Sequence, residues 1–102
     1  MGLFGMFSQK DNTNEIKEYL EKGAVVLDVR TIEEWNAGHS EGAQFITLST
    51  IAARVDEVKS WNKPVIAVCK SGGRSGQATQ FLQSQGIDII NGGPWQNVDQ
   101  YL

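Results

Sequence analysis

One short stretch of the 102-residue chain combines a nucleophile with groups that bind anions. The stretch CKSGGRS, residues 69–75, contains the only cysteine, two glycines and two basic side chains. Backbone N–H groups of a glycine-containing loop can converge on one point, and the start of a helix stabilises an anion there. The same field lowers a thiol pKa. The stretch therefore predicts a thiolate nucleophile at Cys69 that attacks an anionic substrate.

The other side chains of this stretch have expected roles as well. Lys70 and Arg74 add positive charge at the rim, and Gly72 and Gly73 allow the backbone to curl. Ser71 and Ser75 either hydrogen-bond the sulfur or cap the following helix. A simpler interpretation also remains open, in which Cys69 is a buried structural thiol before an ordinary glycine turn.

The elements around this stretch alternate between strands and helices. Apolar periodicity, glycine stops and capping residues predict helical segments at 13–22, 31–38, 49–61, 75–86 and 95–102, and strands at 24–29, 43–48, 65–69 and 87–90. A turn is expected at 91–95, around the two glycines. This order indicates an α/β fold with a mostly parallel sheet covered on both faces. Ligands bind beyond the carboxyl ends of such strands, where Cys69 stands.

The bulk composition limits the classes of function. The length suits one domain, expected over 13–102, after a leader at 1–12. Nine basic and twelve acidic residues give a net charge of −3, with no basic excess to suggest nucleic acid. One cysteine cannot form an intrachain disulfide, and it favours a reducing, cytoplasmic location. Cys69 and His39 are the only soft metal ligands, so no metal is expected, and the apolar N-terminal run is too short to span a membrane.

Three separated motifs, in order, resemble the rhodanese (sulfurtransferase) family. CKSGGRS resembles the active-site loop of that family, VVLDVRTIEEWNAGHSEGA resembles its Asp-Val-Arg, Glu-aromatic, Gly-His and Gly-Ala signature, and INGGPW resembles its late Gly-Gly turn. The resemblance runs from about residue 13 to the C-terminus. It implies a single rhodanese-like domain with a sheet of about five parallel strands and helices on both faces.

The resemblance also implies a chemistry. Cys69 matches the sulfur-accepting cysteine, which cycles between thiolate and persulfide, and residues 70–74 match the loop whose amides cradle the outer sulfur. Asp28, Arg30, Glu34 and His39 match positions of the family signature and are expected to hold the scaffold. The implied donor is thiosulfate or another sulfane sulfur compound, the acceptor is cyanide, a small thiol or a protein cysteine, and no cofactor is required.

The sequence departs from the family pattern away from Cys69. Ser40 and Glu41 replace the usual apolar residue and proline after Gly38-His39, and Phe45 and Thr47 replace the usual Asn and Pro of the next strand. Two alternatives to sulfur transfer are a rhodanese-like binding module or sulfur carrier, and a cysteine-dependent phosphatase. Only four residues separate Cys69 from Arg74, whereas phosphatases of a related fold have five, so the shorter loop favours sulfur over phosphate.

Overall fold

The computed structural model of the protein describes residues 12–102, so the leader expected at 1–12 lies, apart from Asn12, outside the described residues. The elements follow in the order α1 (Thr13–Glu21), β1 (Val25–Asp28), α2 (Ile32–Ala37), β2 (Gln44–Phe45), η2 (Leu48–Arg54), α3 (Val55–Ser60), β3 (Val65–Cys69), α4 (Gly73–Ser84), β4 (Ile89–Pro94) and α5 (Trp95–Asp99). This alternation confirms the predicted α/β class. No helix in this range has the length and apolar character needed to cross a bilayer.

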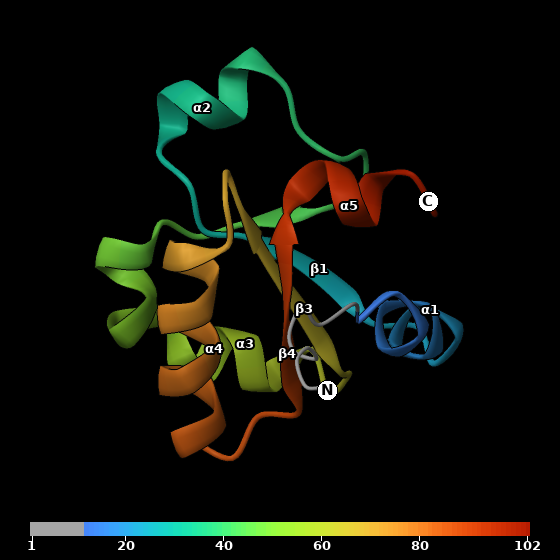
Figure 1. Cartoon of the computed structure of the whole chain (residues 1–102). Helices are drawn as coiled ribbons and strands as arrows, with labels where there is room; N and C mark the ends of the chain where they lie inside the picture. Colours follow the sequence, from blue (N-terminus) through green and yellow to red (C-terminus); the bar gives the residue numbers. More distant parts are fainter. Residues whose placement is uncertain (1–11) are drawn as a thin grey trace, which may run out of the picture.

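The strands form one parallel sheet in the order β2-β1-β3-β4. The described residues form four strands, where the family resemblance implied about five. Helices cover both faces, as predicted: α3 and α4 lie on one side of the sheet, and α1 and α5 lie on the other (Figure 1). The short helix α2 lies above the carboxyl ends of the strands, beside the turn that follows β3 (Figure 1).

The apolar strands are buried because their side chains alternate between two cores. On the α4 side, Leu27 and Ala67 pack in one cluster with Leu82. On the α1 side, Val26 and Ile66 belong to a second cluster with Ile16, Val68, Ile90 and Val98. All five residues of β3 are buried, including Cys69. The central strand is therefore held from both sides, which fixes the position of its last residue.

Two of the predicted elements are shorter or divided in the structure. The strand expected at 43–48 is a two-residue edge strand, although Ile46 N–H still bonds the Asp28 carbonyl at 3.1 Å. The helix expected at 49–61 is a 3-10 helix, η2, followed by α3. Thr47 explains the tight start of η2, because its carbonyl accepts from Thr50 N–H and its hydroxyl contacts the Ser49 and Thr50 hydroxyls.

The turn expected at 91–95 was wrong, because β4 continues through the two glycines to Pro94. Pairing with β3 survives through a register shift: Ala67 pairs with Asn91, and Val68 pairs with Gly93. Gly92 is the extra residue of this irregularity. A Cβ atom there would lie 2.6 Å from Ile66 Cγ2 and 2.8 Å from Val98 Cγ2. Only glycine leaves room for β3 and α5 to pack against this part of β4.

This crowding predicts that Gly92→Ala lowers the free energy of unfolding by about 1–3 kcal/mol, as overpacking of a core does. Urea denaturation monitored by circular dichroism measures the change. Gly73→Ala is the matched control for stability, because a Cβ there meets no atom within 4 Å. An unfolding free energy for Gly92→Ala equal to that of wild type would contradict the packing argument.

Candidate active site

The thiol loop, defined as residues 69–75, joins the end of β3 to the start of α4. Cys69 is the last residue of β3, and Gly72 occupies the N-cap position of α4 with a φ of 105°. Such a left-handed conformation favours glycine, and a Cβ on Gly72 would also lie 3.4 Å from Gly93 Cα. The chain therefore turns from strand to helix within three residues, directly above the sulfur.

Hydrogen-bond donors of the thiol loop point at the Cys69 sulfur. Gly72 N–H donates to Sγ at 3.0 Å and Ser75 N–H donates at 3.3 Å. The Ser75 hydroxyl lies 3.3 Å from the same atom. Because these groups stand at the N-terminus of α4, the helix dipole adds to their field. The convergence of N–H groups expected from the sequence is thus present, with the sulfur at its centre.

Burial and hydrogen bonding act on the thiol in opposite directions. The Cys69 side chain has no exposed surface, and this burial raises the pKa of the thiol. The Ser75 hydroxyl, followed by the N–H groups of Ser75, Gly72 and Ser71, lowers it, and the net pKa of Cys69 is lowered. The site therefore favours the thiolate, in line with the sequence prediction.

Arg74, which the sequence placed at the rim of the anion site, forms an ion pair with Glu34 of α2. Its Nη1 and Nη2 donate to the two carboxylate oxygens of Glu34 at 2.7 and 3.0 Å. Glu34 also accepts from Thr31 N–H at 3.0 Å, and Thr31 Oγ1 accepts from Glu34 N–H. This reciprocal pair is a capping box at the start of α2. The neighbouring Lys70 side chain is exposed.

Asp28 and Arg30 form a second ion pair at the carboxyl end of β1. Both residues are buried, and Arg30 Nη2 donates to Asp28 Oδ2 at 2.7 Å while Arg30 Nε donates to both carboxylate oxygens. Arg30 Nη2 also donates to the Gly38 carbonyl at 2.7 Å, and its guanidinium lies 5.1 Å from the centre of the Trp95 ring. These contacts join β1 to the end of α2 and to α5.

His39 follows the end of α2, and its contacts are with Trp35 of that helix rather than with the thiol loop. Its ring stacks on Trp35 with centroids 3.5 Å apart, and Nδ1 lies 2.8 Å from the Trp35 carbonyl oxygen. The histidine is exposed and packs within its own segment. Within residues 12–102, no group of three His, Cys, Asp or Glu side chains could hold a metal ion.

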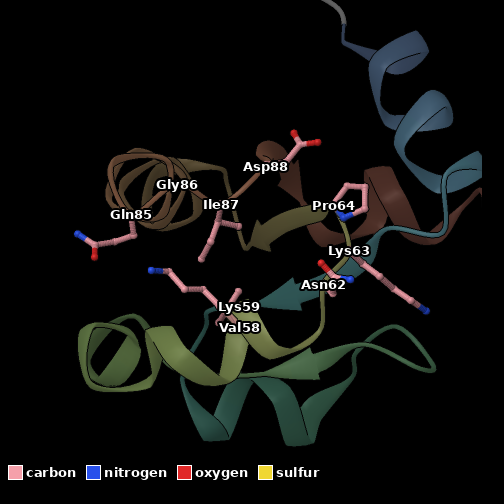
Figure 2. Close-up of a pocket in the computed structure, with 9 residues that line it drawn as sticks. All are labelled: Val58, Lys59, Asn62, Lys63, Pro64, Gln85, Gly86, Ile87 and Asp88. Carbon is pink, nitrogen blue, oxygen red and sulfur yellow. The ribbon is translucent and has the colours of Figure 1, made fainter.

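Two open pockets flank the thiol loop. One of about 270 Å³ lies on the α2 side and is lined by Arg30, Glu34, Ala37, Gly38, Lys70, Trp95 and Gln96. The other, of about 820 Å³, lies on the β4 side, and its lining includes Ser71, Gly72, Asn91 and several further amide side chains. A third pocket of about 450 Å³ is formed by residues 58–59, 62–64 and 85–88 (Figure 2). It includes no residue of the thiol loop.

Sequence reasoning missed one residue of the site, Asn91 on β4. The Ser75 hydroxyl donates to Asn91 Oδ1 at 2.6 Å, and Asn91 Nδ2 donates to the Gly72 carbonyl at 3.0 Å. Asn91 Oδ1 also accepts from Gly93 N–H at 2.9 Å. The asparagine before two glycines is a common turn signal, so the pattern pointed to a turn and away from the site.

A family model described as "Rhodanese-like domain" matches residues 12–94. The chain belongs to the rhodanese-like domain family. The uncharacterized protein YqhL of Bacillus subtilis is 40% identical over 67 residues, which are 66% of this chain and 52% of that relative. The match therefore spans about half of that relative's length.

Two solved structures extend the comparison to three dimensions. A rhodanese-like domain protein from Staphylococcus aureus is 32% identical, with a TM-score of 0.66 and coverage of 84% of this chain and 86% of that one. The human single-domain sulfurtransferase TSTD1 is 28% identical, with a TM-score of 0.66 and coverage of 82% of this chain and 88% of that one. The family resemblance read from the sequence is thus confirmed.

The ion pair with Arg74 predicts an unusually acidic carboxyl at Glu34. The Arg74 guanidinium, and then Thr31 N–H, lower the pKa of Glu34 from its usual 4.5 to about 2. A carboxyl whose pKa is lowered by folding stabilises the folded state at every pH above its pKa in the unfolded chain. This contribution to the free energy of unfolding is lost as the pH falls from 4.5 to about 2. We expect the Glu34 carboxyl carbon to titrate near the lower value by NMR.

Arg74→Gln is the matched variant for this titration. It keeps the capping box of α2 but removes the guanidinium, so the Glu34 midpoint should move upward toward its usual value. A midpoint near 4.5 in the wild-type protein would show that the ion pair does not form in solution.

Proposed function

We propose that the protein is a single-domain sulfurtransferase in which Cys69 carries sulfane sulfur as a persulfide. The observation that carries this proposal is the set of N–H groups, from Gly72 and Ser75, that donate to Cys69 Sγ at the start of α4. The lowered pKa of Cys69 supports it, because the thiolate is the nucleophile. The likeness to a human protein described as a single-domain sulfurtransferase supports it as well.

In the first step, the Cys69 thiolate attacks the outer sulfur of thiosulfate. A new S–S bond forms to Cys69, and the S–S bond of thiosulfate breaks with its electron pair leaving on sulfite. A persulfide donor reacts in the same way and releases a thiolate. A thiolate has no proton to lose, so the step needs no general base when the loop holds Cys69 in that form.

In the second step, an acceptor removes the outer sulfur. Cyanide attacks that sulfur and leaves as thiocyanate, or a thiolate attacks it and leaves as a new persulfide. The S–S bond to Cys69 breaks, and its electron pair returns to Cys69 as thiolate. The cycle therefore closes without any change in the protein's redox state. A free thiol that must stay reduced suits a cytoplasmic location.

The outer sulfur needs donors of its own while it carries negative charge. Gly73 and Arg74 are the first two residues of α4, so their N–H groups have no carbonyl partner within the helix. They are the natural donors for the terminal sulfur, and Lys70 is the nearby exposed cation for the rest of an anionic donor. Arg74 serves the anion less directly than the sequence suggested, since its guanidinium is bound to Glu34.

The complete burial of Cys69 sets a condition on this chemistry. A donor reaches Sγ only when residues above it move, and two of the loop residues, Gly72 and Gly73, are glycines that permit such movement. We expect the donor to approach through one of the two pockets that flank the thiol loop, from the Trp95 side or from the Asn91 side.

The same burial favours a second candidate function, a binding module or sulfur carrier with little turnover. The Cys69 thiol has no exposed surface, and the loop arginine is already paired with Glu34. Both features are more typical of a scaffold than of an open catalytic site. In that case the rhodanese-like fold would dock a partner, and Cys69 would be inert or loaded by another protein. Reactivity of the thiol separates the two candidates.

The persulfide predicts a mass change. After incubation with thiosulfate, intact mass spectrometry should detect wild-type protein heavier by one sulfur atom, and cyanide should remove that sulfur. Cys69→Ser should stay unmodified while its thermal unfolding remains cooperative. Transfer of sulfur by Cys69→Ser would exclude Cys69 as the carrier.

The thiolate predicts a pH profile. The rate of alkylation by iodoacetamide should rise with pH, with a midpoint below that of an ordinary thiol. The reason is that the hydrogen bonds from Ser75, Gly72 and Ser71 lower the pKa of Cys69 by more than burial raises it. Denatured protein is the internal reference for an unperturbed thiol. A folded protein that resists alkylation over the whole pH range, and that gains no sulfur, would favour the binding module.

A further inference from the structure

Asn91 contacts the thiol loop at two points, and each contact bears on a different donor. Its Nδ2 donates to the Gly72 carbonyl at 3.0 Å, and its Oδ1 accepts from the Ser75 hydroxyl at 2.6 Å. The Asn91 side chain is itself anchored, because Oδ1 also accepts from Gly93 N–H. One amide group on β4 therefore holds both halves of the loop that surrounds Cys69.

The contact with Gly72 fixes the orientation of a peptide group. The Gly72 carbonyl belongs to the same planar unit as Gly73 N–H, and in a trans peptide the two point in opposite directions. Asn91 binds the carbonyl from the β4 side, so Gly73 N–H is directed away from β4. Gly72 and Gly73 restrict the rotation of this peptide less than other residues would, because glycine has no Cβ. The Gly72 carbonyl also accepts from Gly76 N–H at 2.9 Å, the first backbone bond of α4, and the amide of Asn91 adds a second restraint from outside the helix.

The contact with Ser75 concerns a single proton. The Ser75 hydroxyl has one hydrogen and two neighbouring acceptors, Asn91 Oδ1 at 2.6 Å and Cys69 Sγ at 3.3 Å. When Cys69 is a thiol, S–H can donate to Ser75 Oγ while Ser75 donates to Asn91. When Cys69 is a thiolate, the hydroxyl can turn and donate to the sulfur. The bond to Asn91 therefore places Oγ beside the thiol, and Asn91 gives up the Ser75 proton when the sulfur ionises.

Other charged groups near Cys69 do not depend on Asn91. Lys70 and Arg74 lie on the thiol loop, Glu34 of α2 binds Arg74, and Asp28 and Arg30 form a buried pair at the end of β1. These two carboxylates are each paired with an arginine. A change at Asn91 therefore acts on the sulfur through the loop, with these charges held constant.

We propose that Asn91 is a positioning residue for sulfur transfer, which orients the Gly72–Gly73 peptide and the Ser75 hydroxyl around Cys69. The inference rests on the proposed function for its effect on turnover, and it deepens that function by adding β4 to the site. Asn91 does not touch the reacting sulfur; it acts through Gly72 and Ser75.

The test uses Asn91→Ala in the full chain and compares the alkylation–pH profile of Cys69 with that of wild type. In this variant the Ser75 hydroxyl is no longer held beside Cys69, so roughly one hydrogen bond to the thiolate should be lost. The midpoint should therefore rise by about one pH unit. At a pH below both midpoints, the rate of persulfide formation from thiosulfate should fall by about tenfold, in proportion to the fraction of thiolate.

A second variant keeps the test decisive if the alanine variant unfolds. Asn91→Gln is neutral and keeps both a donor and an acceptor, but its extra methylene displaces them from the Gly72 carbonyl and the Ser75 hydroxyl. The midpoint should therefore rise in this variant as well, with no added charge to raise it.

The matched control is Asn97→Ala, an exposed asparagine that lines the same pocket on the β4 side. Its midpoint should equal that of wild type. A lower melting temperature for both Asn91 variants with an unchanged alkylation midpoint would overturn the proposal and leave a purely structural role. If wild type forms no persulfide and the midpoint still rises in the Asn91 variants, the positioning of the thiolate stands and sulfur transfer fails.

Discussion

A sulfur anion without exposed surface is stable only where fixed hydrogen-bond donors replace the water it has lost, and the site is organised around this constraint. β3 buries Cys69 by placing it at the end of a fully apolar strand. The start of α4 brings Gly72 and Ser75 N–H to the sulfur, which requires the left-handed turn at Gly72. β3 thus removes water from the sulfur, and the start of α4 supplies hydrogen-bond donors in place of that water.

Helix α2 illustrates how polar contacts position an element that has no core of its own. It has six residues, and none of them is buried. The capping box of Thr31 and Glu34 begins it, the pair of Glu34 with Arg74 ties it to the thiol loop, and Arg30 holds the Gly38 carbonyl at its end. A helix attached in this way keeps its place through charge and hydrogen bonding rather than through apolar area.

The sequence predicted those features that depend on local pattern. Apolar runs located the strands, glycines located the helix ends, and CKSGGRS located the loop after β3. The features that it missed depend on pairing between distant residues. The ion pair of Arg74 with Glu34 could not be read from the sequence, because the two residues stand forty positions apart. Asn91 was assigned to a turn because the register shift opposite Val68, which extends β4, is a property of two strands together.

Glu34 takes part in two motifs at once, since one carboxylate completes the capping box of α2 and neutralises Arg74 of the thiol loop. A mutation at position 34 therefore disturbs a helix start and a loop charge in the same event, whereas a mutation at Thr31 disturbs only the first. Among descendants of a common ancestor, positions 34 and 74 should accordingly change together or not at all, while position 31 drifts more freely between serine, threonine and aspartate. The sulfur chemistry proposed for this site would then constrain the sequence of a surface helix whose own contacts are with Arg74 and Arg30 rather than with Cys69.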